Sequence, residues 1–101
     1  MSEIQDKIVA TSRSESGKGA ARKLRAQGLA PAVVYGPGVE PTHLSVDATE
    51  LVRVRRAFGS THVYNVAVEG GESYKAMIRE IQVEPVHRTI QHVDFWAVDL
   101  T

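Results

Sequence analysis

Polar and apolar residues alternate along the last part of this chain, a period-two pattern that is typical of a strand with one buried face. The pattern runs from about Thr89 to Val98. One face of the predicted strand, which we expect to be buried, carries Val93, Phe95 and Ala97. The opposite face, open to solvent or to a partner, carries His92, Asp94 and Trp96. Similar apolar runs predict further short strands at about residues 7–12, 32–35, 43–46, 62–68 and 73–79, the last extended by Gln82 and Val83.

Two segments have apolar residues at the spacing of a helix instead. The first covers residues 19–27 and ends before Gly28, because glycine readily adopts the left-handed conformation that follows many helices. The second begins after Asp47, a residue type that caps helices, and Glu50 follows three positions later as in a capping box. Gly59 ends it.

Six short strands and two helices without regular alternation favour a mostly β protein with short helices, of the α+β class. Strands this short are best stabilised when the sheet closes on itself. We therefore predict a small, closed, six-stranded barrel that is mainly antiparallel, with the two helices over its openings. The length of 101 residues suits a single domain that spans residues 1–101.

Positive charge is concentrated in one segment, although the whole chain has a formal net charge of zero. The segment from Arg13 to Arg25 holds five basic residues and one acid, Glu15. On a helix, Lys18, Arg22 and Arg25 share one face. A basic cluster of this density in a neutral protein predicts a binding site for an anion.

Several explanations stay open for polar residues elsewhere in the chain. His92 and Asp94 lie two apart on a strand, so they face the same side. They could form half of a metal site or an acid–base pair, or they could only hydrogen-bond to each other or lie in solvent. Tyr35 could belong to the core or serve as a stacking platform.

A second basic group, Arg53, Arg55 and Arg56, lies on the second predicted helix. Successive helical residues differ by about 100°, so these three cannot all point the same way, and a solvated helix surface is favoured. The segment around Lys18 resembles a phosphate-binding P-loop, but the residue after the lysine is Gly19 rather than the required Ser or Thr. Contact with phosphate without catalysis is the better interpretation.

The composition excludes several classes of protein. The chain contains no cysteine, so it forms no disulfide and no thiolate metal site. No apolar run approaches the roughly 20 residues of a membrane span. The first residues lack the basic and apolar regions of a secretory signal. We therefore expect a cytoplasmic protein with no cofactor and no membrane partner.

Two long segments resemble a known family. Residues 17–25, Gly-Lys-Gly-Ala-Ala-Arg-Lys-Leu-Arg, and residues 28–36, Gly-Leu-Ala-Pro-Ala-Val-Val-Tyr-Gly, are similar to the N-terminal signature of one bacterial ribosomal family. This is the large-subunit protein numbered twenty-five, together with the related general stress protein Ctc. The later segments that fit the same family are Glu80-Ile81-Gln82, Pro85 and His92-Val93-Asp94-Phe95. The resemblance extends from about residue 8 to about residue 97.

The resemblance implies a six-stranded barrel that binds 5S ribosomal RNA (rRNA) at its loop E region, as a structural component of the large ribosomal subunit. It implies that the chain is not an enzyme, that neighbouring ribosomal proteins are further partners, and that the chain is a monomer away from the ribosome. RNA of this kind is recognised by shape, phosphates and exposed base edges. The positions that match the RNA-binding residues of the family are Arg13, Lys18, Arg22, Arg25, Tyr35, Arg79, Gln82, His92 and Asp94.

The chain departs from the family pattern in two places. Members often carry a basic residue or histidine between the glutamine and the proline, where this chain has Val83 and Glu84. An acid there could weaken a peripheral phosphate contact. Residues 97–101 resemble the start of the linker that leads to a second β-domain in longer members.

Two other classes of function stay open. An enzyme for a small phosphate ligand would use Lys18, His92 and Asp94, and turnover or bound metal would reveal it. A protein-binding barrel would use the aromatic face around Trp96, and capture of a partner without RNA would reveal it.

Overall fold

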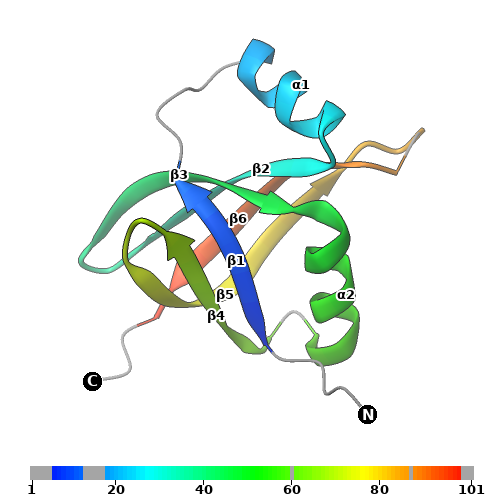
Figure 1. Ribbon diagram of the computed structural model, residues 1–101. Helices are drawn as coiled ribbons and strands as arrows, with labels where there is room; N and C mark the ends of the chain where they lie inside the picture. The colour runs from blue at the N-terminus through cyan, green and yellow to red at the C-terminus, as the bar shows by residue number, and fades with distance from the viewer. Residues whose placement is uncertain (1–5, 13–17, 60, 87, 99–101) are drawn as a thin grey trace.

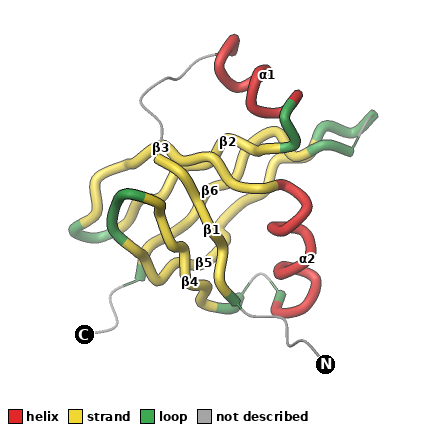
Figure 2. The backbone as a smooth tube through the Cα atoms, viewed as in Figure 1, coloured by secondary structure: helices red, strands yellow, loops and turns green. Residues whose placement is uncertain are grey.

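The computed structural model describes residues 6–12, 18–59, 61–86 and 88–98. The elements, in chain order, are β1 (Lys7–Ser12), α1 (Lys18–Ala26), β2 (Leu29–Gly36), β3 (Val39–Asp47), α2 (Ala48–Phe58), β4 (Val63–Glu69), β5 (Ser73–Val83) and β6 (Ile90–Ala97). The six strands form a closed barrel in the order β1-β3-β2-β6-β5-β4 (Figure 1). Strands make up most of the traced backbone (Figure 2). The predicted fold class, a closed six-stranded barrel with two helices, is confirmed.

The barrel is mixed rather than purely antiparallel. The pairs β1–β3, β2–β3, β4–β5 and β5–β6 are antiparallel, whereas β1–β4 and β2–β6 are parallel. The two parallel pairs join strands that are far apart in the sequence and close the barrel. Alternation within a strand says which face is buried but not which way a neighbour runs, so the sequence could not predict them.

Alternate residues of the strands fill the interior of the barrel. In β6 the predicted inner face is confirmed, because Val93, Phe95 and Ala97 are all buried. Leu51 and Val54 of α2 are also buried in this core, and α2 covers one end of the barrel (Figure 1). The expected position over an opening therefore holds for α2, whereas α1 packs against β2 on the outside of the wall. Within the described residues, neither helix is long and apolar enough to cross a membrane.

The ends of both helices have the structure that the sequence predicts. The side chain of Asp47 accepts a hydrogen bond from the backbone N–H of Glu50 at 3.0 Å, which satisfies one of the free N–H groups at the start of α2. The N–H of Gly59 donates to the carbonyl of Arg55 at 2.7 Å and closes the other end. Gly28 follows α1 with a φ of 80°, in the left-handed region.

A buried tyrosine connects the end of α2 to the barrel. The Tyr64 side chain is fully buried, and its hydroxyl donates to the carbonyls of Gly59 and, at 3.4 Å, Val54. Burial raises the pKa of Tyr64, so the hydroxyl stays protonated and keeps its role as a donor. Beside it, the Nε2 atom of His62 lies 2.9 Å from a carboxylate oxygen of Asp6, and this hydrogen bond lowers the pKa of the Asp6 carboxyl.

Gly36 lets β2 and β6 approach closely, and replacing it should destabilise the barrel. A Cβ at this position would lie 2.6 Å from the carbonyl oxygen of Ala97, a backbone atom that cannot turn aside. We expect Gly36→Ala to cost about 1–3 kcal/mol, because one of the two strands must shift. Urea unfolding followed by circular dichroism measures the loss.

Gly19→Ala is the matched control for this substitution. Gly19 lies in α1, and nothing lies within 4 Å of the added Cβ. In a helix, alanine is favoured over glycine by about 0.5–1 kcal/mol, so this variant should be as stable as the parent or more so. Equal stability of the Gly36→Ala variant and the parent would contradict the close approach of the two strands.

Candidate nucleic-acid interface

The outer face of three neighbouring strands, β2, β6 and β5, carries most of the polar residues singled out in the sequence. The side chains of His92, Asp94 and Trp96 alternate with the buried residues of β6 and are half-buried at this outer surface. In the register of the sheet, Gln82 of β5 lies opposite His92, and Tyr35 of β2 lies opposite Trp96. Residues far apart in the sequence therefore meet on one surface.

His92 and Asp94 contact each other directly. The Nδ1 atom of His92 lies 2.9 Å from Oδ1 of Asp94, so of the explanations that the sequence left open, the mutual hydrogen bond is present. Because Asp94 engages Nδ1, the other ring nitrogen, Nε2, is the one available to a partner. In the described part of the chain, no group of three or more His, Cys, Asp or Glu residues is placed to hold a metal ion.

Arg79 lies over the ring of Trp96, at an irregularity in β5. The pairing of β5 with β6 shifts register between Ile78 and Glu80, which leaves Arg79 as an extra residue in the strand. Its guanidinium carbon lies 5.0 Å from the centre of the Trp96 ring, a cation–π contact. On the other side, Tyr35 meets the same ring edge to face, with the ring centres 5.5 Å apart. Tyr35 is therefore a half-buried surface residue rather than part of the core.

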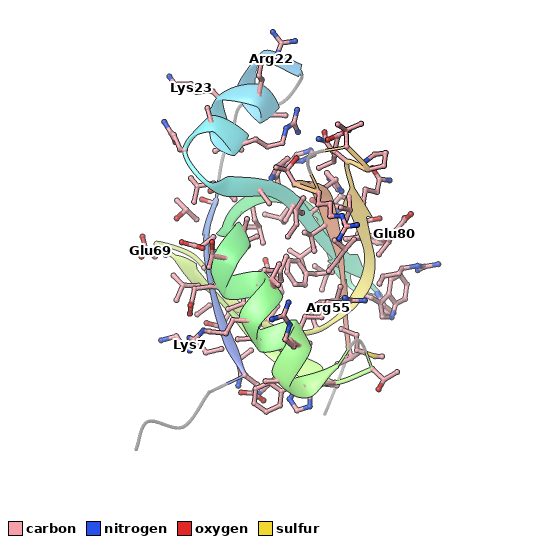
Figure 3. The ribbon with its side chains drawn as sticks, turned by 90° about the vertical axis from the view of Figure 1, so that its right-hand side faces the viewer. Lys7, Arg22, Lys23, Arg55, Glu69 and Glu80 are labelled. Carbon is pink, nitrogen blue, oxygen red and sulfur yellow. The ribbon has the colours of Figure 1, made fainter. Side chains whose placement is uncertain are left out.

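The basic helix α1 is connected to this strand face through Arg25. The half-buried Arg25 donates a hydrogen bond of 3.3 Å to the backbone carbonyl of Gln91, the residue before His92. Arg22 is exposed, and Arg22 and Lys23 extend away from the barrel (Figure 3). The last turn of α1 is basic, which complements the negative end of the helix dipole.

Two of the residues predicted from the sequence cannot be placed in this surface. Arg13 lies outside the described residues. Lys18 is the first residue of α1, but its side chain also lies outside the described part of the chain. The remaining predicted positions form two adjoining groups, one on α1 and one on the strands, made up of Arg22, Arg25, Tyr35, Arg79, Gln82, His92 and Asp94.

Trp96 is not among the RNA-binding positions that the resemblance implies, although it belongs to the aromatic face considered for a protein partner. The sequence pattern did indicate Trp96, because it shares the strand face of His92 and Asp94. Aromatic side chains on a polar face often contact a binding partner. The contact of Trp96 with Arg79 could not be predicted, since that contact depends on the pairing register of β5 with β6.

These observations define a small closed barrel with an outward basic helix beside a polar and aromatic strand face. Comparison with known proteins identifies the family: residues 8–95 match the model of the Ribosomal L25p family. The chain belongs to this family, and the resemblance stated above is confirmed. The relatives below carry the name of a ribosomal subunit protein rather than that of an enzyme, which agrees with the expected function.

The similar proteins are named large ribosomal subunit protein bL25. The chain is 44% identical over 97 residues to the protein of Syntrophobacter fumaroxidans, covering 92% of this chain and 49% of the relative. It is 41% identical over 92 residues to that of Gluconobacter oxydans, covering 90% and 42%. It is 43% identical over 102 residues to that of an Anaeromyxobacter species, covering 96% and 42%. The chain thus spans less than half the length of these relatives.

Proposed function

We propose that this chain binds 5S rRNA at the loop E region, as a structural component of the large ribosomal subunit in the cytoplasm. The observation that carries the proposal is the hydrogen bond from Arg25 to Gln91, which joins the basic helix α1 to the face of His92 and Asp94. One surface then offers both cations for phosphates and directional polar groups for bases. Its other partners would be neighbouring ribosomal proteins.

The two parts of the surface have different chemical roles in this proposal. Exposed arginines such as Arg22 contact phosphate oxygens, which fix the position of the RNA without reading its sequence. Gln82, His92 and Asp94 are short, directional donors and acceptors that suit exposed base edges. A carboxylate such as Asp94 repels phosphates, so its place on this face fits a contact with a base amino group.

The rings of Tyr35 and Trp96 would contribute in a third way. Aromatic side chains and arginine guanidinium planes stack on bases and pack on riboses. The Arg79 guanidinium already lies over Trp96, so it is oriented before RNA arrives. Because the side chain is already oriented, it loses less conformational entropy when RNA binds.

We expect tight binding to 5S rRNA with a marked dependence on salt concentration. Four to five phosphate contacts, at about 0.7–0.9 log units each, give a slope of log K against log salt of roughly −3 to −4.5. Removing one contact with Arg22→Ala should reduce the steepness of this slope by about 0.7–0.9. Trp96 is the only tryptophan in the chain, so its fluorescence can follow the titration.

The matched control is Arg55→Ala. Arg55 is another exposed arginine, but it lies on α2 rather than on the proposed surface. Transfer RNA serves as the control ligand. Equal affinity for the two RNAs would contradict the proposal, and a flat salt dependence would contradict its electrostatic part.

A further inference from the structure

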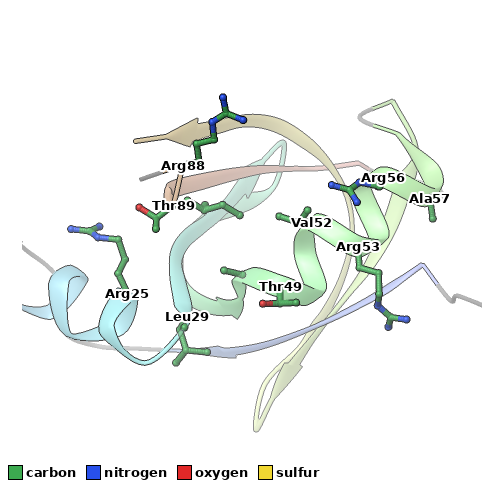
Figure 4. A pocket seen from close by; sticks show the side chains of 12 residues that line it. Arg25, Leu29, Thr49, Val52, Arg53, Arg56, Ala57, Arg88 and Thr89 are labelled. Carbon is green, nitrogen blue, oxygen red and sulfur yellow. The ribbon is translucent and has the colours of Figure 1, made fainter. Parts of the chain in front are cut away.

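A groove of about 700 Å³ lies between α2, the end of α1 and the segment that leads into β6 (Figure 4). Its apolar lining is aliphatic and includes Leu29, Val52 and Ile90. Val52 projects from α2 toward Thr89 on the opposite side (Figure 4). Val52 is 41% exposed, although it is a large apolar residue at the middle of a helix.

Arginines surround this aliphatic lining. Arg25 and Arg88 lie on one side of the groove, and Arg53 and Arg56 lie on the other (Figure 4). No acidic residue is among the described residues that line it. The groove is therefore a concave, electropositive site with an apolar interior.

Among the described residues, no acid forms an ion pair with three of these arginines, Arg25, Arg56 and Arg88. Arg53 forms an ion pair of 2.7 Å with Glu50, so its charge is compensated. Arg25 donates to a backbone carbonyl, which carries no net charge. For Arg56 and Arg88, the described part of the chain contains no ion pair. An occupant that supplies negative charge would complement them.

The sequence favoured a solvated helix surface for the three arginines of α2, but in the structure they do not all have the same surroundings. Arg53 and Arg56 line the groove together with Val52, whereas Arg55 does not. This combination of an apolar patch with a charged rim is typical of an interaction site.

The lining favours a protein segment over RNA as the occupant. No aromatic ring is among the described residues of the groove, so it offers bases no platform for stacking. Aliphatic side chains of a peptide would pack against Val52 and Ile90, and carboxylates would pair with the arginines, which bind them bidentately. We propose that this groove binds an acidic, amphipathic segment of another protein, with its aliphatic side chains inserted beside Val52.

The test uses a fluorescein-labelled peptide of about 16 residues, long enough to form a helix, with leucines along one face and glutamates elsewhere. Fluorescence anisotropy should give a dissociation constant of roughly 10–100 μM with the parent protein. Val52→Asp should weaken binding at least about tenfold, and Arg56→Glu at least about fivefold. A peptide with lysines in place of the glutamates should not bind.

Two matched controls separate the groove from general effects of charge and polarity. Arg55→Glu adds the same charge to the same helix outside the groove, and Val9→Asp alters another exposed valine, on β1. Both should bind the acidic peptide like the parent. Equal binding of the acidic and basic peptides, or equal loss in the groove and control variants, would overturn the proposal.

A parallel titration with 5S rRNA distinguishes this inference from the proposed function. The Val52→Asp and Arg56→Glu variants should keep the RNA affinity of the parent to within about twofold. If they lose RNA and peptide binding together, the groove belongs to the RNA site and the inference is wrong. If the parent binds the peptide but not 5S rRNA, the inference stands and the proposed function is wrong.

Discussion

Replacing Phe95 with alanine should lower the free energy of unfolding by about 3–5 kcal/mol. Phe95 is fully buried in β6, where its partners in the register are Val34 of β2 and Ile78 of β5. Truncation removes the largest side chain of this strand from the core and leaves a cavity that the closed barrel cannot collapse to fill. A small domain has a total stability of about 5–15 kcal/mol, so the loss is a large part of the whole.

Urea unfolding followed by circular dichroism measures this loss, with Val9→Ala as the control. Val9 is 49% exposed on β1, so its truncation should change stability by less than about 0.5 kcal/mol. A loss below about 1 kcal/mol for Phe95→Ala would show that Phe95 does not hold the centre of the core. Asp94 and Trp96 flank Phe95 on the opposite face of β6, so unfolding of this strand would also abolish the proposed RNA surface.

The fold was largely predictable because alternation is a local property of each strand. The predicted bounds of β1, residues 7–12, match the observed strand, and the inner face of β6 is as expected. β2 begins at Leu29, earlier than the predicted strand of residues 32–35, and includes Pro31. Proline has no backbone N–H to donate to a neighbouring strand. Pro31 pairs with β3, whereas the pairing of β2 with β6 begins only at Ala32, so the sheet tolerates a proline at this position.

The candidate site was predictable only where it depends on a single strand. The spacing of His92 and Asp94 in β6 predicted that they share a face, and of the alternatives left open their mutual contact is present at 2.9 Å. The contact of Arg79 with Trp96 depends on the pairing register of β5 with β6, which alternation within one strand cannot reveal. The groove forms where the segment of Arg88 lies near α2. These two segments are far apart in the sequence, so their proximity could not be predicted from local patterns.

The assignment of RNA-binding roles came from the resemblance to the family rather than from the residues alone. The basic cluster predicted an anion, and membership in a ribosomal protein family agrees with RNA as that anion. The role of each residue stays a prediction. Arg22 and Asp94 are the most informative to compare, because one is an exposed cation on α1 and the other an acid on the strand face.

Asp94→Ala should reduce affinity for loop E RNA by about 1–3 kcal/mol, roughly 5- to 150-fold, while binding to a scrambled duplex stays the same or becomes tighter. The variant loses an acceptor for base amino groups and the bond that orients His92. It also loses a negative charge that repels phosphates, which favours every RNA equally. Arg22→Ala, which removes a phosphate contact, should instead weaken both RNAs by a similar factor.

The measurement is a pair of dissociation constants for each variant, one for loop E RNA and one for the scrambled duplex, at a single salt concentration. Asp94→Asn is the matched variant, because its amide oxygen can still accept a hydrogen bond from His92 while the charge is removed. If the charge alone matters, the alanine and asparagine variants will behave alike. If accepting a base amino group and orienting His92 matter, the asparagine variant will keep part of the specificity. Equal losses on both RNAs for Asp94→Ala would mean that Asp94 only supports the fold, and the division between positioning and reading residues would have to be abandoned.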